Sequence, residues 1–498
     1  MFKSLLLALL LPFSILAQNV GINTSSPIGR LHIKSEGFVT PLVLDIPAAE
    51  QQATPFIKFF REGVEVFRLG ATYTNFFAGV DAGKNCFGSD NNLIGRSSGF
   101  SLTNGTGNTA MGDRTMLANT GGSYNKAYGA LAFNSGNSSF NTAIGAQSMF
   151  GQSGGFNTSV GARAMYYSSS ANQYNVAVGY EALRGSTVIA NNFGSNNVAV
   201  GNSSLLNNSS GFDNTATGHE ALQGNSTGSH LVAVGTGALK FNSTGVFNTA
   251  VGKQSLQFNN AGSYNTGVGY LTLGNTNGAQ YNTAIGFRSG DGFNNGFNNV
   301  FVGANADVSA AGLFNVIALG QGTTVAASSV ARFGNSATTS YGGWAGWTNV
   351  SDGRFKADIK ENVPGLSFIN KLRPVTYHLK AAALDAFQKK GLTKSMSEKA
   401  ADAYTVALRE KESVVQTGFI AQEVQLAAAS LGYEFSGIDK PKNDHDVYGL
   451  RYAEFVVPLV KAVQELSVQT DLQDKLIAEM MRKQQLLIEL VKKRKEGN

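Results

Sequence analysis

A short block of small and apolar residues recurs along most of the chain. A pattern close to Asn-Thr-Ala-apolar-Gly closes on a glycine every 16 to 22 residues between positions 95 and 320. The closing glycines are Gly95, Gly112, Gly129, Gly145, Gly161, Gly179, Gly201, Gly218, Gly235, Gly252, Gly269, Gly286, Gly303 and Gly320. The seven intervals from Gly201 onward are all 17 residues. Side chains alternate within each block, so that Thr249 and Val251 face one side of an extended chain and Ala250 the other. The pattern therefore predicts one short β-strand per repeat.

Stacking of these strands is what the repeat favours. One rung cannot bury its own apolar face, whereas stacked rungs can, and identical Asn side chains at one position can pair in ladders. Glycine and Asn suit the corners because both tolerate a positive φ. The 14 repeats predict a β-solenoid or β-roll of roughly 65 Å at about 4.8 Å per rung. A disordered Gly/Asn/Ser-rich segment is the alternative, and the nearly constant spacing argues against it.

The repeats at residues of about 90 to 320 resemble the head repeats of trimeric autotransporter adhesins. In that group a similar strand-glycine unit winds into a left-handed roll shared by three chains. The repeat here is longer than is usual for the group, so the resemblance does not fix the winding. Calcium binding of the kind seen in nonapeptide repeats is not expected, because the Gly-Gly-x-Gly-x-Asp signature is missing.

The N-terminus has the pattern of an export signal. Residues 1–17 have an early Lys3, an apolar run from Leu5 to Leu16, and Ala17 where a signal peptidase would cut. The run is too short to span a bilayer comfortably, so we expect no membrane span. Residues 18–90 contain apolar-polar alternations, notably at 56–69, which predict a β-rich cap. We therefore expect a secreted or cell-surface protein.

Charge divides the chain near residue 350. Lys, Arg, Asp and Glu number 14 between positions 101 and 350 and 43 between 351 and 498. The net charge of +6 is small for 498 residues, and part of it lies in the terminal run Lys492–Lys495, which is typical of a solvated helix end. Nucleic acid is therefore not an expected partner. Cys86 is the single cysteine, so no intrachain disulfide can form.

Four ordered blocks follow the junction. They are Val350–Ile359 (VSDGRFKADI), Leu372–Tyr377 (LRPVTY), Gly418–Val424 (GFIAQEV) and Tyr448–Tyr452 (YGLRY). In this order they resemble the peptidase S74 family, the intramolecular chaperone domains of phage tail spikes and tail fibres, including endosialidases. The resemblance covers residues 351 to about 470. It implies a domain that chaperones assembly of a homotrimer and then cleaves itself off.

The resemblance assigns the cleavage chemistry to two residues. Ser351 is implied as the nucleophile and Lys356 as the base, with the Val350–Ser351 bond as the cleavage site. A lysine can deprotonate a serine hydroxyl if burial lowers the pKa of its amine. The structural alternative is that Ser351 and Asp352 cap a helix, since both residue types are good N-caps. Asp352 and Arg354 match the family pattern and receive no catalytic role.

The last 40 residues read as a helix. Val463, Thr470, Ile477, Gln484 and Val491 at a positions place Leu466, Gln473, Met480 and Leu487 at d positions, a heptad seam of about four repeats. A coiled coil is the favoured interpretation. An amphipathic helix packed on its own domain is the alternative, since Leu472 and Leu476 lie off the seam. The stretch from Lys380 to Glu412 predicts a helix or variable insertion without recognisable chemistry.

The predicted architecture is a mainly β repeat stalk followed by an α+β chaperone domain that ends in a long coiled-coil helix. Its parts are a signal peptide (1–17), a β-rich cap (18–90), the stalk (91–340), the chaperone domain (351–455) and the C-terminal helix (456–498). The protein is expected to be an exported trimeric fibre or adhesin-like structural protein. Its only enzymatic activity would be one self-cleavage per chain.

A secreted fibre that binds or degrades glycans is the second hypothesis. Tyr166, Tyr167 and Phe297 are candidates for contacting a surface glycan or host receptor. Most glycosidases need paired carboxylates. The acids between 101 and 350 are Asp113, Glu181, Asp213, Glu220, Asp291 and Asp307, mostly on separate repeats. The five histidines lack metal-ligand spacing, and no nucleotide-binding glycine loop is present, so neither metal nor cofactor is expected.

Overall fold

The computed structural model describes residues 20–22, 31–33, 57–61, 64–70, 74–151, 154–188, 191–344, 346–389 and 398–496. The predicted signal peptide at 1–17 lies outside these residues. Near the N-terminus, β1 (Val20–Ile22) pairs in parallel with β2 (Leu31–Ile33). The predicted alternation at 56–69 coincides with β3 (Ile57–Arg61) and β4 (Val64–Gly70), which form an antiparallel pair.

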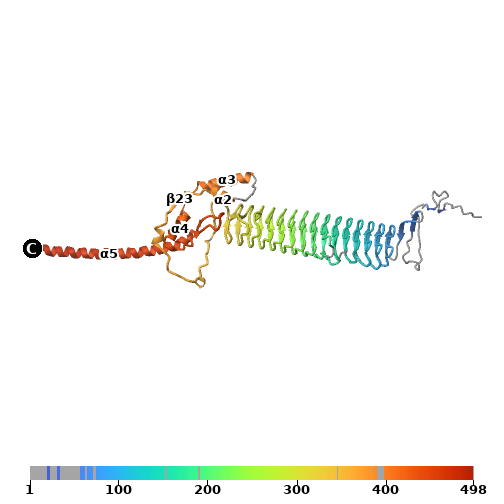
Figure 1. Cartoon of the computed structure of the whole chain (residues 1–498), viewed down its shortest axis with the longest axis horizontal. Helices are drawn as coiled ribbons and strands as arrows, with labels where there is room; N and C mark the ends of the chain where they lie inside the picture. The colour runs from blue at the N-terminus through green and yellow to red at the C-terminus, as the bar shows by residue number, and fades with distance from the viewer. Residues whose placement is uncertain are drawn as a thin grey trace, which may run out of the picture. The chain divides into compact units, whose positions relative to one another are not determined.

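The repeats form a parallel β-solenoid, drawn as the ladder of short arrows in Figure 1. The chain divides into two compact units, which meet in sequence at Phe156 and Asn157. The first unit contains the rungs β5 (Phe76–Ala78), β6 (Asn92–Ile94), β7 (Thr109–Met111), β8 (Lys126–Tyr128) and β9 (Thr142–Ile144). The second contains β10 (Thr158–Val160), β11 (Val176–Val178), β12 (Val198–Val200), β13 (Thr215–Thr217), β14 (Val232–Val234), β15 (Thr249–Val251), β16 (Thr266–Val268), β17 (Thr283–Ile285), β18 (Val300–Val302), β20 (Ile317–Leu319) and β22 (Ala331–Phe333). A small second sheet joins β19 (Asp307–Val308) to β21 (Thr324–Val325). The predicted fold class is thereby confirmed for the stalk.

Two rungs lie beyond those found from the repeat. Strand β5 and strand β22 continue the stack, pairing with β6 and β20 respectively. Their sequences, Phe76-Phe77-Ala78 and Ala331-Arg332-Phe333, depart from the Asn-Thr-Ala pattern. The 22-residue interval between Gly179 and Gly201 leaves the register intact, since Ala177 still pairs with Ala199. The extra residues are therefore accommodated outside the strands.

The alternation within each strand is as predicted. Ala250 is fully buried and pairs with Ala233 and Gly267 on the adjacent rungs, while Thr249 and Val251 face outward. A second interior position follows seven residues after the strand begins, where Leu256 is also fully buried. Most rungs thus contribute one small and one large apolar side chain to the core.

Buried asparagines hold successive rungs together. The Asn265 backbone N–H donates to Asn248 Oδ1 at 2.9 Å, and the Asn282 N–H donates to Asn265 Oδ1 at 3.1 Å. The Asn265 side-chain amide also donates to the carbonyl of Ala279 at 2.7 Å. These bonds confirm the predicted Asn ladder. They satisfy backbone groups that the short strands leave without strand partners.

A second Asn ladder runs through the turns. Asn225, Asn242 and Asn259 each donate to the Oδ1 of the asparagine one rung earlier, at 2.7, 2.9 and 2.9 Å. The same amides bond the carbonyl of a glycine three residues later, as Asn259 does to Gly262 at 2.8 Å. The Asn ladder before the strands and the Asn ladder in the turns therefore both depend on the register of the stack.

The corners contain left-handed residues that are not glycine. Gly252 has a φ of +126°, as expected of a corner glycine, but Gln254 and Leu256 have φ values of +58° and +51°. A left-handed leucine costs about 1–2 kcal/mol. The neighbouring rung offsets this cost, since the Leu256 N–H bonds to the carbonyl of Thr272 at 2.9 Å. Glycine and Asn are therefore joined at these corners by other residue types, because stacking over-determines the backbone there.

The residues after the stalk form a small α+β region. Its elements are η3 (Gly353–Phe355), α1 (Leu366–Ile369), β23 (Val375–His378), α2 (Ala381–Gln388), α3 (Glu398–Ser413), β24 (Val415–Gly418), α4 (Ala421–Ala429), β25 (Ile438–Asp439), β26 (Gly449–Leu450), η4 (Tyr452–Phe455) and α5 (Val456–Glu496). Strand β23 pairs antiparallel with β24, and β25 with β26. The core comprises Phe368, Val424, Ala427, Ala428, Phe435 and Phe455. This arrangement confirms the predicted α+β class.

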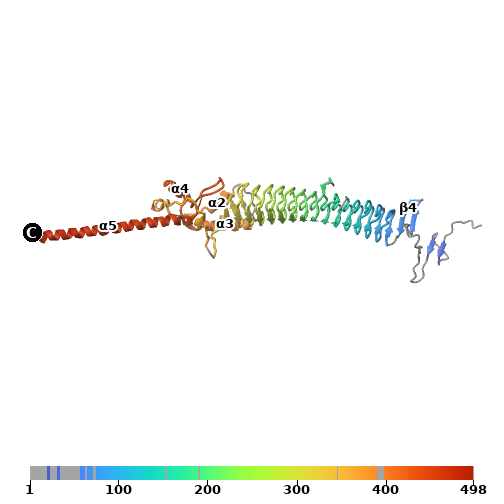
Figure 2. The same cartoon turned by 90° about the horizontal axis from the view of Figure 1, so that it is seen from below.

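Helix α5 is 41 residues long and confirms the predicted C-terminal helix. Its start is anchored, since Ala462 is buried and Glu465 accepts a hydrogen bond from the Leu366 N–H at 2.7 Å. From Leu466 to Lys495 every side chain is exposed, so this part does not pack on its own domain (Figure 2). Within the described residues, no helix is both long and apolar enough to cross a bilayer.

Candidate self-cleavage site

A tight turn brings Lys356 back to Ser351. Asp352 is the N-cap of η3, and its Oδ1 accepts a hydrogen bond from the Arg354 N–H at 2.9 Å. One turn later the Lys356 Nζ lies 2.8 Å from the Ser351 Oγ and donates a hydrogen bond to it. The cap proposed as the structural alternative is therefore present on Asp352, and it coexists with the Ser351–Lys356 contact.

The Asp352–Arg354 pair stiffens this turn. The two side chains form an ion pair with an N–O distance of 2.6 Å. The hydrogen bonds from Arg354 lower the pKa of the Asp352 carboxyl, and the carboxylate in turn raises the pKa of the Arg354 guanidinium. Both groups lie at the surface, so their contribution to stability is small. Their geometric effect is to hold the loop that separates Ser351 from Lys356.

Solvent surrounds the site in the single chain. Ser351 and Lys356 are both exposed, and the flanking apolar residues Val350, Phe355 and Ile359 are 91 %, 80 % and 76 % exposed. A lysine acts as a general base only when it has lost its proton, which desolvation favours. The single chain thus brings the Lys356 amine to the Ser351 hydroxyl and leaves both groups exposed to solvent.

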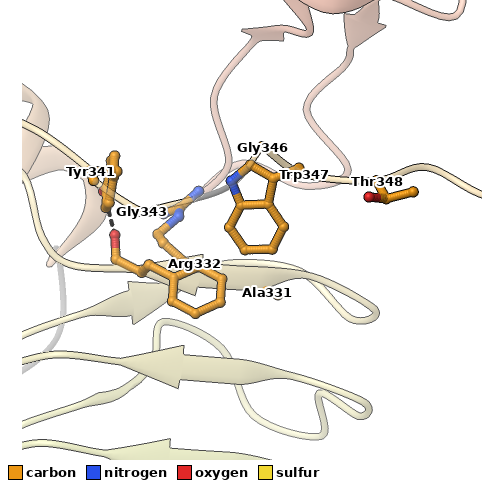
Figure 3. A pocket seen from close by; sticks show the side chains of 9 residues that line it. Ala331, Arg332, Tyr341, Gly343, Gly346, Trp347 and Thr348 are labelled. Carbon is orange, nitrogen blue, oxygen red and sulfur yellow. Dashed lines mark hydrogen bonds between the residues drawn. The ribbon is translucent and has the colours of Figure 1, made fainter.

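Aromatic residues lie between Ser351 and the last rung of the stalk. A cavity of about 880 Å³ lies between the last rung and the junction, lined by Ala331, Arg332, Phe333, Tyr341, Gly342, Gly343, Gly346, Trp347 and Thr348. Figure 3 shows the Trp347 indole beside Arg332, above the last strand. The ring centroids of Trp347 and Phe333 are 6.1 Å apart. Trp344, three residues earlier, is fully exposed.

The other three family-like blocks meet at one place. A second cavity of about 590 Å³ is lined by Arg373, Val375, Thr376, Tyr377, Phe419, Ile420, Ala421, Gln422, Val447, Tyr448, Leu450 and Tyr452. Arg373 bonds Glu423 across the blocks, and the Tyr452 hydroxyl accepts a hydrogen bond from the Phe419 N–H at 3.1 Å. The block that contains Ser351 and Lys356 does not line this cavity. The structure therefore joins three of the four blocks.

The stalk carboxylates do not form the pairs that glycosidases use. Asp113 pairs with Arg96 and Arg114, and Glu181 pairs with Arg163 and Arg184. Glu220 pairs with Lys240, Asp291 with Arg288, and Asp213 lies 3.6 Å from His230. Asp307 accepts a hydrogen bond from the Gly292 N–H. Each acid is thus engaged with a base or a backbone donor on its own or a neighbouring rung, an arrangement that serves structure.

The aromatic candidates for glycan contact are also engaged. Tyr166 and Tyr167 pack edge to face at 4.7 Å, with the Arg163 guanidinium 5.0 Å from the Tyr166 ring. Phe297 stacks on Phe314 at 5.1 Å. Sugars bind to open ring faces, and stacking covers at least one face of Phe297. Among the described residues no group of His, Cys, Asp and Glu could hold a metal ion.

Cys86 is a buried free thiol. Burial raises the pKa of this thiol to about 11, so it stays protonated and unreactive at neutral pH. It serves as a small apolar side chain in the stalk.

Comparison with known proteins gives a match for the C-terminal region. Residues 351–433 match the family model Peptidase_S74, described as chaperone of endosialidase. The searches of curated proteins and of solved structures gave no match. The match covers the first three family-like blocks except Val350, and the fourth, at 448–452, lies beyond it. The resemblance predicted from the blocks is therefore confirmed: the segment from Ser351 to Tyr433 is similar to the Peptidase_S74 chaperone of endosialidase.

Proposed function

We propose that this chain is an exported fibre protein whose C-terminal region assembles three copies and then cleaves the Val350–Ser351 bond. The observation that carries the proposal is the 2.8 Å contact between Lys356 Nζ and Ser351 Oγ, inside a segment similar to the S74 chaperones. A spacing of five residues alone would not carry it, since such pairs are common by chance.

The cleavage step follows from these two groups. Lys356, as the free amine, takes the Ser351 hydroxyl proton while Oγ attacks the carbonyl carbon of Val350. The Val350–Ser351 C–N bond breaks, and the leaving amine takes the proton from Lys356. The resulting ester between Val350 and Ser351 Oγ is hydrolysed by water. The products are a stalk that ends in the Val350 carboxylate and a domain that begins with the Ser351 amine.

Assembly would supply the missing desolvation. The apolar residues around Ser351 are exposed in one chain, and neighbouring copies could cover them. A covered lysine loses its proton more readily because burial disfavours its charged form. Cleavage would therefore follow assembly, which prevents a stalk from losing its chaperone too early.

Two apolar surfaces support association of copies. The outward strand residues Val200, Val234, Val251, Val268, Ile285 and Val302 form a row along the stalk and are 36–44 % exposed. The seam of α5, with Leu466, Ile477, Met480 and Leu487, is more than half exposed. Another copy in the same register matches both repeats, because its rungs and heptads have the same spacing. The trimeric habit of S74 chaperones favours three copies.

The test compares the whole chain with two single variants. Wild type is expected to yield a fragment whose N-terminus is Ser351, whereas Ser351→Ala and Lys356→Met should remain intact on a denaturing gel. Lys360→Met, which removes an exposed lysine four residues later, is the matched control and should cleave as wild type does. Intact wild-type protein, or normal cleavage of Ser351→Ala, would reject the self-cleavage mechanism.

A further inference from the structure

The last rung of the stalk presents carbonyl groups that a further rung would use. In the rungs before it, the carbonyls of Val302 and Leu319 accept hydrogen bonds from the N–H groups of Gly320 and Gly334, at 2.8 and 2.7 Å. At β22 the equivalent carbonyl is that of Phe333, and it accepts a hydrogen bond from the Tyr341 hydroxyl instead. Where the stack ends, a side chain from outside the repeat thus donates the hydrogen bond that the next rung would otherwise donate.

Helices α2 and α3 supply the largest group of such side chains. Figure 1 shows both helices beside the last rungs. Tyr404 of α3 donates to the Asp385 carboxylate of α2 at 2.6 Å, and its hydroxyl lies 2.8 Å from the Ser336 Oγ, just beyond β22. Ser336 also donates to Asp385. Lys389 completes the group, with its Nζ 2.8 Å from Asp385 and 4.3 Å from the centre of the Tyr404 ring.

Three more polar contacts join the same two regions. Lys411, near the end of α3, donates to the carbonyl of Thr338. From the loop after β25, Asn443 donates to the carbonyl of Ala326 at 2.6 Å, and Lys442 donates to that of Ser328 at 3.3 Å. All three acceptors are backbone carbonyls at the end of the stalk. These are the groups that remain open when a parallel stack stops.

The contact between the α2 and α3 side chains and the end of the stalk is partly shielded from solvent. The side chains of Asp385 and Lys389 are only 16 % and 26 % exposed. Burial, followed by the hydrogen bond to Asp385, raises the pKa of the Tyr404 phenol, so that Tyr404 remains a donor. Burial lowers the pKa of Lys411. Charge-assisted hydrogen bonds in such partly buried settings are stronger than those at the open surface.

We propose that helices α2 and α3 form a latch whose binding partner is the segment that follows the last rung of the stalk. The latch consists of Asp385, Tyr404, Lys389 and Lys411, and it holds Ser336 and Thr338. Given cleavage at Val350–Ser351 as proposed above, cutting the peptide bond would not release the C-terminal region, because the contacts of Ser336 with Asp385 and Tyr404, and of Thr338 with Lys411, join the two sides of the cut. Release would be a separate step, set by how long the latch stays closed.

The test uses an external protease so that it does not depend on self-cleavage. A protease recognition sequence is inserted between Val350 and residue 351 of the full chain carrying Ser351→Ala. After cutting, the two pieces are expected to co-elute on size exclusion in physiological salt. With Asp385→Asn and Tyr404→Phe added, the pieces should separate at least about tenfold faster, since the hydrogen bonds that join Ser336 to the Asp385 carboxylate and to the Tyr404 hydroxyl are weakened or lost.

Asp402→Asn on the exposed face of α3 is the matched control and should leave co-elution unchanged. A circular dichroism melt of each uncut protein checks that the variants fold. Immediate separation of the cut parent would overturn the latch, and so would equal retention of the double variant. Because Ser351→Ala cannot cleave itself under the proposed mechanism, failure of self-cleavage leaves this test valid, and failure of the latch leaves self-cleavage untouched.

Discussion

The stalk and helix α5 differ in whether a single chain buries their side chains. In the stalk, apolar and Asn side chains from successive rungs bury one another within one chain, as Ala250, Leu256 and Asn265 do. In α5 the backbone is satisfied internally, but all side chains from Leu466 to Lys495 remain exposed. A repeat can build its own interior, whereas a lone helix cannot. In the proposed trimer, this difference makes the exposed seam of α5 the first candidate for the surface that joins the copies.

The largest expected effect comes from charged substitutions on the α5 seam, which test whether this seam joins the copies. Ile477→Asp with Leu487→Asp places charges on the α5 seam, and we expect trimers to dissociate completely, because each buried charge would be unpaired. Sedimentation measures the change. Leu472→Asp, equally exposed but off the seam, is the control and should leave the assembly intact. If the double variant still forms trimers, the stalk or the chaperone region, and not the α5 seam, holds the copies together.

The next largest expected effect is the loss of stability caused by a substitution at one corner of the stalk. In Gly252→Ala the new Cβ would lie 2.4 Å from the carbonyl oxygen of Gly269, at a φ of +126°. We expect a local loss of about 3 kcal/mol, from strain and the clash together. Hydrogen exchange of the rungs around β15 reports it, because stability in a repeat stack is local. Gly237→Ala, whose Cβ meets nothing closer than 3.6 Å, should cost much less. Equal protection in both variants would contradict the corner geometry.

The Asn ladder should give a smaller loss. Asn265→Ala removes the acceptor of the Asn282 N–H and the donor to the Ala279 carbonyl, both in the buried interior. Leaving buried groups unpaired predicts a loss of about 2 kcal/mol, again read by hydrogen exchange. Asn260→Ala, an exposed neighbour in the turn, is the control. Should both substitutions cost the same, the ladder would not be a source of stability.

The smallest effect is electrostatic. The hydrogen bond from Arg96 lowers the pKa of Asp113 to about 2. A lowered carboxyl pKa stabilises the fold above about pH 4, and this stabilisation is lost as the pH falls from about 4 towards 2. The carboxylate is 35 % exposed, so screening limits the effect to less than about 1 kcal/mol. Thermal melts at pH 7 and pH 2.5 should differ less in Asp113→Asn than in wild type. An unchanged difference would show that Asp113 contributes nothing.

The sequence predicted the parts of the fold that repetition makes visible. Thr249-Ala250-Val251 and its copies specify the strand and its buried face, and the Asn before most of the strands specifies the ladder. The left-handed backbone of Leu256 was not predictable, because no local preference favours it and only the neighbouring rung imposes it. Strand β22 was missed for a related reason, since its place comes from pairing with β20.

The candidate site could be predicted only because four ordered sequence blocks resemble the peptidase S74 family. Ser351 and Lys356 are close in sequence, so a local turn suffices to join them. The contact of Ser336 with Tyr404 joins residues 68 positions apart and leaves no pattern in either segment. The stretch from Lys380 to Glu412, predicted to carry no recognisable chemistry, contributes Asp385, Tyr404 and Lys411 to the contact with the end of the stalk.

The most direct test of the account is the mass of the purified wild-type protein under native and denaturing conditions. After denaturation we expect one piece that ends at Val350 and one that begins at Ser351, and under native conditions we expect three copies of each. A single intact chain that is monomeric under native conditions would contradict both the assembly and the cleavage.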